Sequence, residues 1–255
     1  MGTCRLLRPA RLRSVRLRQR RGHTVAQAVE DLDSLREALG FDAWTILGWS
    51  YGGFLAQKYL LEHPERVNGL VLVGALPAIA VKLEPTRQQE FISSQEAKRI
   101  AEIHSDPSLS TALKVYNAHL CGDWKRQYYY KGTPEGLARK ALYEWTHAEN
   151  FRSEILSSES YRQIENPDVF RGCPVPILIA EGRWDLTWNA DKPEKLVGCF
   201  DDAELVMFEE SAHGPFMDEP DRFFPMLEGF MAGLPAVDEK ATATWKEYAV
   251  RLLNV

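Results

Sequence analysis

The chain has 255 residues and a formal net charge of −5, with 45% hydrophobic and 26% charged residues. This balance fits a soluble globular enzyme, and the length is enough to bury one large core, or a core and a lid. No apolar run approaches the roughly eighteen residues that a membrane-spanning helix requires. The four cysteines lack the close spacing of zinc sites, and they are too few to stabilise a chain of this length by disulfide bonds. We therefore expect reduced thiols in a soluble, cytoplasmic protein.

The first 22 residues form an arginine-rich arm, which carries eight arginines and no acidic residue. Such an arm could bind nucleic acid or an acidic membrane surface, or act as a transit peptide. Downstream, apolar residues recur at helical intervals over 25–39, and Gly40 is a stop signal. The other face of this predicted helix is acidic, and we expect it to be solvated: Glu30, Asp31 and Asp33.

The sequence Gly48-Trp49-Ser50-Tyr51-Gly52 stands between a predicted strand, 44–47, and a predicted helix, 54–62. In this context the turn strains the serine backbone and lifts its hydroxyl above the sheet edge. We predict that a side chain at Gly48 or Gly52 would collide with the neighbouring strand or helix. A helix starting at Tyr51 would direct backbone N–H groups and the positive end of its dipole at an anion beside Ser50.

The G-x-S-x-G pattern alone arises by chance in roughly one chain in ten of this length, so an activating base and acid must also be found. Residues 175–180 read as a buried strand that ends shortly before Asp185. Residues 203–208 read as another strand, and His213 lies in the loop that follows it. Open α/β sheets build their sites at such strand ends. A lone histidine is more often a surface residue and such an aspartate a turn former, but the order Ser, Asp, His favours a catalytic triad.

The remaining segments indicate an α/β fold. Residues 67–73 form a further predicted strand, and the alternation of strands and helices is typical of a parallel, doubly wound sheet. Between residues 77 and 171 the alternation stops, and helices are predicted over 88–102, 108–120, 134–149 and 151–164. Residues 218–232 read as the last helix that covers the sheet. The tail, 237–253, has the apolar spacing of a helix. Whether this helix packs on the body of the molecule or on a partner chain stays open.

These motifs make the chain resemble the α/β-hydrolase superfamily, and residues 47–53, 182–185 and 211–214 are most similar to its proline iminopeptidase branch. The resemblance covers about residues 25–233. It implies that Ser50 is the nucleophile, that His213 is the general base and acid, and that Asp185 orients the imidazole. The backbone N–H of Tyr51 would be one oxyanion donor. The implied domains are an arm (1–22), a hydrolase core (23–76 and 172–236), a helical cap (77–171) and a helical tail (237–255).

The resemblance also implies a substrate site. A cap glutamate would hold the free amino terminus of the peptide, and Glu149 lies in the segment that resembles its surroundings. Trp49, Trp145 and Trp184 are candidates for lining an apolar pocket suited to a proline ring, although aromatic residues in helices are more often core. Leu186 follows Asp185 where the family has a second acid, which weakens the peptidase assignment relative to an esterase.

The resemblance further implies strands before residue 44 and a His-Gly-Gly loop that supplies the second oxyanion donor. No His-Gly pair precedes Ser50, and only residues 12–19 weakly resemble a strand. Our leading interpretation of the arm is therefore a truncated or frame-disrupted start, with a functional targeting or binding arm as the alternative. Without one oxyanion donor the rate would fall by about 10² to 10³.

We therefore expect a serine hydrolase that forms an acyl-enzyme and releases an N-terminal proline from short peptides. A carboxylesterase or amidase that acts on small esters or amides is the first alternative, and a catalytically impaired hydrolase-like protein is the second. No cofactor and no metal are expected, because serine acyl transfer requires neither and no phosphate loop or metal motif occurs. The expected partner is a small-molecule or short-peptide substrate, with neither nucleic acid nor a membrane, and a homo-oligomer remains open.

Overall fold

The computed structural model describes residues 24–80, 92–122, 163–187 and 191–253. The predicted arm lies outside these residues. The strands are β1 (Trp44–Trp49), β2 (Val67–Val73), β3 (Ile177–Gly182) and β4 (Ala203–Phe208). The helices, with two short 3-10 turns η1 and η5, are α1 (Val25–Ala38), α2 (Tyr51–Glu62), η1 (Pro64–Arg66), α3 (Ser94–Ser105), α4 (Thr111–Leu120), η5 (Pro167–Phe170), α7 (Lys192–Val197), α8 (Pro215–Asp218), α9 (Pro220–Ala232) and α10 (Glu239–Leu253).

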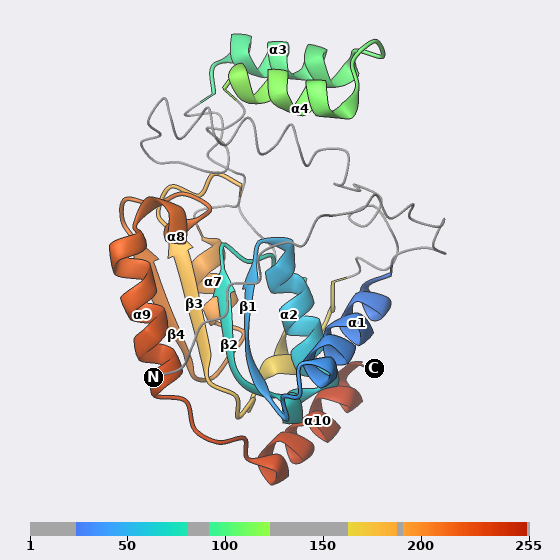
Figure 1. Cartoon of the computed structure of the whole chain (residues 1–255), viewed down its shortest axis with the longest axis vertical. Coiled ribbons are helices and arrows are strands. Elements are labelled where there is room, and N and C mark those ends of the chain that lie inside the picture. Colours follow the sequence, from blue (N-terminus) through green and yellow to red (C-terminus); the bar gives the residue numbers. More distant parts are fainter. Residues whose placement is uncertain (1–23, 81–91, 123–162, 188–190, 254–255) are drawn as a thin grey trace.

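The four strands form one parallel sheet in the order β1-β2-β3-β4, with helices on both faces (Figure 1). α1, α2, α7 and α10 contribute to the larger apolar cluster on one face, and α8 and α9 contribute to a smaller cluster on the other. β2 and β3 are almost continuously apolar because both of their faces are covered. This confirms the predicted parallel, doubly wound sheet, and the carboxyl ends of all four strands meet at one edge of it.

β1 is an edge strand of the described sheet. It pairs with β2 from Trp44 to Trp49, and no second strand neighbour lies among the described residues. Its side chains are correspondingly less covered than those of β2, and Leu47 is 43% exposed. The strand that carries the serine turn is therefore bonded on one side only within the part of the chain that the structure describes.

α1 begins and ends where the sequence predicts. The hydroxyl of Thr24 accepts a bond from the Gln27 N–H at 3.1 Å, and Gly40 has a φ of +75° just after the helix. The expectation of a solvated acidic face is wrong at Asp33. This carboxylate lies 2.8 Å from Arg36 Nε and accepts a bond from the Tyr59 hydroxyl at 2.7 Å, so it ties α1 to α2.

α3 and α4 pack on each other through a small apolar cluster of their own. The pair lies beyond the carboxyl ends of the strands (Figure 1). α3 starts at Ser94 because Ser93 and Glu96 form a capping box. Of the other two helices predicted in this region, residues 134–149 lie outside the described residues. The last, 151–164, is described only at its end, and there it is wrong: Ile164 forms a parallel β-bridge with Ile79.

The helix predicted over 218–232 is interrupted. α8 ends at Asp218 and α9 starts at Pro220, and Glu219 between them has a φ of −128° and a ψ of 57°. The break follows from Pro220, because the residue before a proline is disfavoured in the helical region.

α10 packs on the body of the molecule, which answers the question that the sequence left open. Trp245 is 4% exposed, and its indole N–H donates to the Arg171 carbonyl at 3.0 Å. Its ring lies 6.5 Å from the ring of Phe170, in a stacked orientation. Within the described residues, no helix is both long enough and apolar enough to cross a membrane.

Candidate active site

Ser50 occupies a strained turn between β1 and α2. Its φ of 54° and ψ of −121° make it the one non-glycine residue with a positive φ among the described residues. The strain is held by the backbone, because the Ser50 N–H donates to the Val73 carbonyl and the Ser50 carbonyl accepts from Gly53 and Leu76, each at 3.0 Å. Although Ser50 stands at the N-cap of α2, its side chain makes no capping bond. The Ser50 hydroxyl is thus not used to cap α2.

The turn depends on two close backbone approaches. A Cβ at Gly48 would lie 2.4 Å from the Gly52 carbonyl oxygen, as the sequence predicts. The same prediction is wrong for Gly52, where a Cβ would meet nothing within 4 Å. The second tight position is Gly53, where a Cβ would lie 2.3 Å from the Ala75 side chain. α2 is therefore pressed against β1 and against the segment after β2.

Asp185 and His213 come together. Asp185 Oδ2 lies 2.7 Å from His213 Nδ1, and the two side chains are 4% and 3% exposed. The other oxygen of Asp185 accepts the Thr187 N–H at 2.9 Å, which closes a turn after β3 and fixes the carboxylate. An ionised carboxylate only accepts hydrogen bonds, so this contact places the imidazole proton on Nδ1 and leaves Nε2 as a base.

His213 lies against the ends of β1 and β2. Its carbonyl accepts the Trp49 indole N–H at 2.8 Å, and the two rings are 5.4 Å apart. Gly74, at the end of β2 with a φ of +49°, lies so close that a Cβ there would be 2.9 Å from His213 Nδ1. Ser50 bonds to Val73, the residue before Gly74. The histidine and the serine turn therefore converge on the same strand end.

The loop that carries His213 is held by two carboxylates at the end of α8. Asp218 Oδ2 accepts the Ala212 N–H at 2.9 Å. Glu219 Oε2 accepts both the Ser211 hydroxyl at 2.6 Å and the Glu210 N–H at 3.0 Å. Sequence reasoning missed both acids, and the signal that could have found them is the pair of acidic residues within six positions of His213.

The segment after β2 is held by groups that the sequence analysis also missed. Gln57 of α2 is fully buried, donates to the carbonyls of Gly53 and Leu76, and accepts the Ala78 N–H. Buried glutamines are rare, so a glutamine on the apolar face of a predicted helix was the available signal.

The other predicted site residues have different surroundings. The Tyr51 ring stacks on Phe54 at 5.8 Å, and burial raises the pKa of its hydroxyl. The Trp184 indole donates to the Glu209 carbonyl at 3.0 Å, so Trp184 ties the Asp185 loop to the loop after β4. Glu149 and Trp145 lie outside the described residues.

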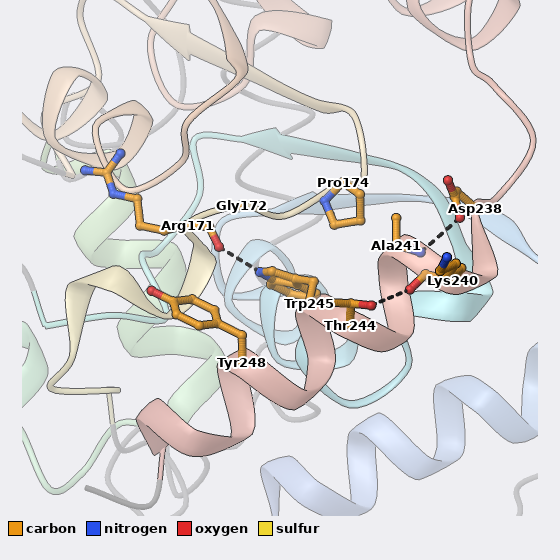
Figure 2. A pocket seen from close by; sticks show the side chains of 9 residues that line it. All are labelled: Arg171, Gly172, Pro174, Asp238, Lys240, Ala241, Thr244, Trp245 and Tyr248. Carbon is orange, nitrogen blue, oxygen red and sulfur yellow. Dashed lines mark hydrogen bonds between the residues drawn. The ribbon is translucent and has the colours of Figure 1, made fainter.

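Two other features lie away from these strand ends. One ligand atom each from Glu30, Glu62 and His63 lies within 4.8 Å of the others, a grouping that could hold a metal ion. A cavity of about 620 Å³ lies between α10 and the segment before β3, at the amino ends of the strands, with Trp245 and Tyr248 along it (Figure 2). None of the predicted catalytic residues lines this cavity.

A parallel doubly wound sheet with a strained serine turn after one strand and an Asp–His contact at neighbouring strand ends defines an α/β hydrolase. The family model for the alpha/beta hydrolase fold matches residues 13–220, and the chain belongs to this family.

Similarity to individual proteins is lower. A proline iminopeptidase of Saccharolobus solfataricus is 23% identical over 220 residues, which cover 82% of this chain and 69% of that protein. A pimeloyl-[acyl-carrier protein] methyl ester esterase of Klebsiella pneumoniae is 27% identical over 182 residues, which cover 69% of this chain and 65% of that protein. A solved esterase structure from Exiguobacterium antarcticum superposes with a TM-score of 0.60 at 22% identity, covering 84% of this chain and 75% of that one. The chain thus spans about two thirds of the length of the curated relatives.

Proposed function

We propose that the chain is a serine hydrolase in which Ser50, His213 and Asp185 form a catalytic triad. The observation that carries the proposal is the buried 2.7 Å contact between Asp185 and His213, beside the strand end to which the strained serine turn is bonded. A histidine in this tautomer carries a lone pair on its second ring nitrogen, and a serine hydroxyl needs such a base to become a nucleophile.

The reaction follows from these roles. The Ser50 hydroxyl attacks the substrate carbonyl while its proton passes to His213 Nε2, and Asp185 stabilises the imidazolium that forms. The Tyr51 N–H, at the start of α2, would donate to the oxyanion. As the tetrahedral intermediate collapses, His213 gives the proton to the leaving amine or alcohol, and an acyl-enzyme remains. Water, deprotonated by His213, then releases the acid and restores Ser50.

For the substrate we propose an N-terminal prolyl peptide, with Glu149 binding the free amine and with Trp49, Trp145 and Trp184 near the ring. The proline iminopeptidase relatives support this choice. A carboxylesterase is the second candidate, because Leu186 follows Asp185 where the peptidase branch has an acid, and because a methyl ester esterase is among the relatives, at 27% identity over 182 residues. A hydrolase-like protein with impaired catalysis is the third.

Turnover of a proline arylamide and of an acetyl ester separates these candidates. If Glu149 binds the amine, Glu149→Gln abolishes amide cleavage and leaves ester cleavage unchanged. Ester cleavage alone in the wild-type chain would favour the esterase. Absence of both activities, with no labelling of Ser50 by a fluorophosphonate, would favour the impaired protein.

A further inference from the structure

A buried ion pair lies next to the proposed triad. Lys192 Nζ at the start of α7 is 2.6 Å from Glu181 Oε1 in β3, and each side chain is 1% exposed. The second oxygen of Glu181 is buried and has no hydrogen-bond partner among the described residues. Burying such a pair costs more free energy than an apolar pair of the same size would, so the pair needs an explanation other than stability.

The ammonium of Lys192 joins two parts of the site. Besides Glu181, it donates to the Ala75 carbonyl at 3.2 Å. Ala75 stands between Gly74, which lies against His213, and Leu76, whose N–H bonds to the Ser50 carbonyl. Because Glu181 belongs to the strand that leads into Asp185, one side chain links the acid's strand to the segment that contacts both the serine turn and the histidine.

The pair also acts on His213 through charge. Burial raises the pKa of Glu181, the charge of Asp185 raises it further, and the charges of Lys192 and His213 lower it. This coupling is reciprocal, so a change in the charge of either Glu181 or Lys192 would change the electrostatic field at His213. The other charged groups around the His213 loop are Asp185, Asp218 and Glu219.

We propose that Lys192 and Glu181 are positioning residues, which hold the segment after β2 in register with the Asp185 strand and keep the net charge beside His213 balanced. This proposal rests on the proposed function. It predicts that the two charges must be balanced, since loss of one of them changes the net charge beside the triad.

The test is the rate at which a fluorophosphonate labels Ser50 in the full-length chain between pH 5 and 9. Glu181→Gln removes the carboxylate charge and keeps the charge of the Lys192 ammonium, which disfavours the imidazolium, so the acid limb of the pH–rate profile should move down by about half a pH unit or more. The double variant Glu181→Gln/Lys192→Met is neutral again. Its acid limb should return to the wild-type position, while its maximal rate stays about tenfold lower because Ala75 has lost its partner.

The control is Asp33→Asn, which breaks an ion pair between α1 residues away from the strand ends. Asp33→Asn should change neither the acid limb of the pH–rate profile nor the maximal rate of labelling. The proposal is overturned if Glu181→Gln keeps the wild-type limb, or if the double variant shifts as far as the single one. Thermal melts of each variant show which of them is folded.

A second measurement separates this proposal from the proposed function. If Ser50 in the wild-type chain is not labelled, the hydrolase proposal fails, but the titration of the His213 ring can still be followed by NMR, with His213→Gln to assign the signal. Glu181→Gln should then move that titration to lower pH, and the double variant should restore it. An unchanged His213 titration would overturn the role of the pair.

Discussion

Two features favour glycine at position 74: the backbone conformation and the close approach of His213. The φ of +49° favours glycine, and a Cβ would come within 2.7 Å of the His213 carbonyl oxygen and 2.9 Å of Nδ1. Gly40 has a similar backbone, with a φ of +75°, but a Cβ there would meet nothing within 4 Å. Comparing substitutions at the two glycines therefore distinguishes the effect of backbone strain from the effect of contact with His213.

Alanine at each position should have different consequences. Gly74→Ala displaces His213 and should lower the rate of Ser50 labelling at least tenfold, because a small misplacement of a base is costly. Gly40→Ala should destabilise the fold by about 1 kcal/mol through strain and leave labelling unchanged. Equal labelling of both variants would show that Gly74 does not position the histidine.

Two tryptophans on β1 form a second matched pair. The Trp49 indole N–H donates to the His213 carbonyl at 2.8 Å, whereas the Trp44 indole nitrogen is buried with no hydrogen-bond partner among the described residues. Trp49→Phe removes a bond to the His213 backbone and should slow Ser50 labelling several-fold. Trp44→Phe relieves an unsatisfied donor, so denaturant melts should show it to be neutral or stabilising. A clear loss of stability in Trp44→Phe would contradict this view.

At the scale of elements, the contact between α1 and α2 includes a carboxylate that should respond to pH: Asp33 pairs with Arg36 of the same helix and accepts a hydrogen bond from the Tyr59 hydroxyl of α2. The hydrogen bond from Arg36, with help from Tyr59, lowers the pKa of Asp33 from 3.8 to about 2. Because the folded-state pKa is depressed, the ionised carboxylate stabilises the fold above about pH 4, and this contribution is lost as the pH falls towards 2.

Asp33→Asn should therefore lower the free energy of unfolding by about 1 kcal/mol at pH 6, where Asp33 is ionised in both states. The difference from the wild-type chain should shrink as the pH falls from 4 to 2. Urea denaturation at several pH values measures it, and the same substitution at the exposed Asp31 is the control. A difference that stayed constant down to pH 2 would rule out this linkage.

The accuracy of the sequence predictions also depends on the element. β2 and β4 match their predicted bounds, because each is a mostly apolar run that ends at a turn signal, although β2 is largely buried and β4 is buried only at Phe208. The start of the helix predicted over 218–232 was placed too early, at Asp218, although Pro220 was the signal for its first turn. Gly53 and Gly74 were missed because their crowding comes from segments distant in the chain.

At the candidate site, the sequence predicted that His213 and Asp185 come together but not the groups that support them. The contact of His213 with Asp185 was expected from the order of motifs. The Lys192–Glu181 pair was not, because neither residue belongs to a motif and burial of both charges depends on how α7 packs over β3. Supports of this kind arise from the packing of distant segments, which periodicity cannot reveal.

At the scale of the whole molecule, α10 extends the core. Trp245 is 4% exposed and contacts η5, while Tyr248, one turn later, is 41% exposed (Figure 2). Trp245→Ala should lower the free energy of unfolding by about 3 kcal/mol or more, as large buried side chains do. Tyr248→Ala should cost less than about 1 kcal/mol. If denaturant titrations gave similar losses for both, α10 would not be part of the folded body.

The central claim is that Ser50 is made nucleophilic by His213 and Asp185. Mass spectrometry of the full-length chain after exposure to a fluorophosphonate tests it most directly, with His213→Gln as the comparison. We predict a single adduct on Ser50 in the wild-type chain, and labelling slower by at least about a thousandfold in His213→Gln. An adduct on another serine, or equal labelling of both chains, would contradict the account.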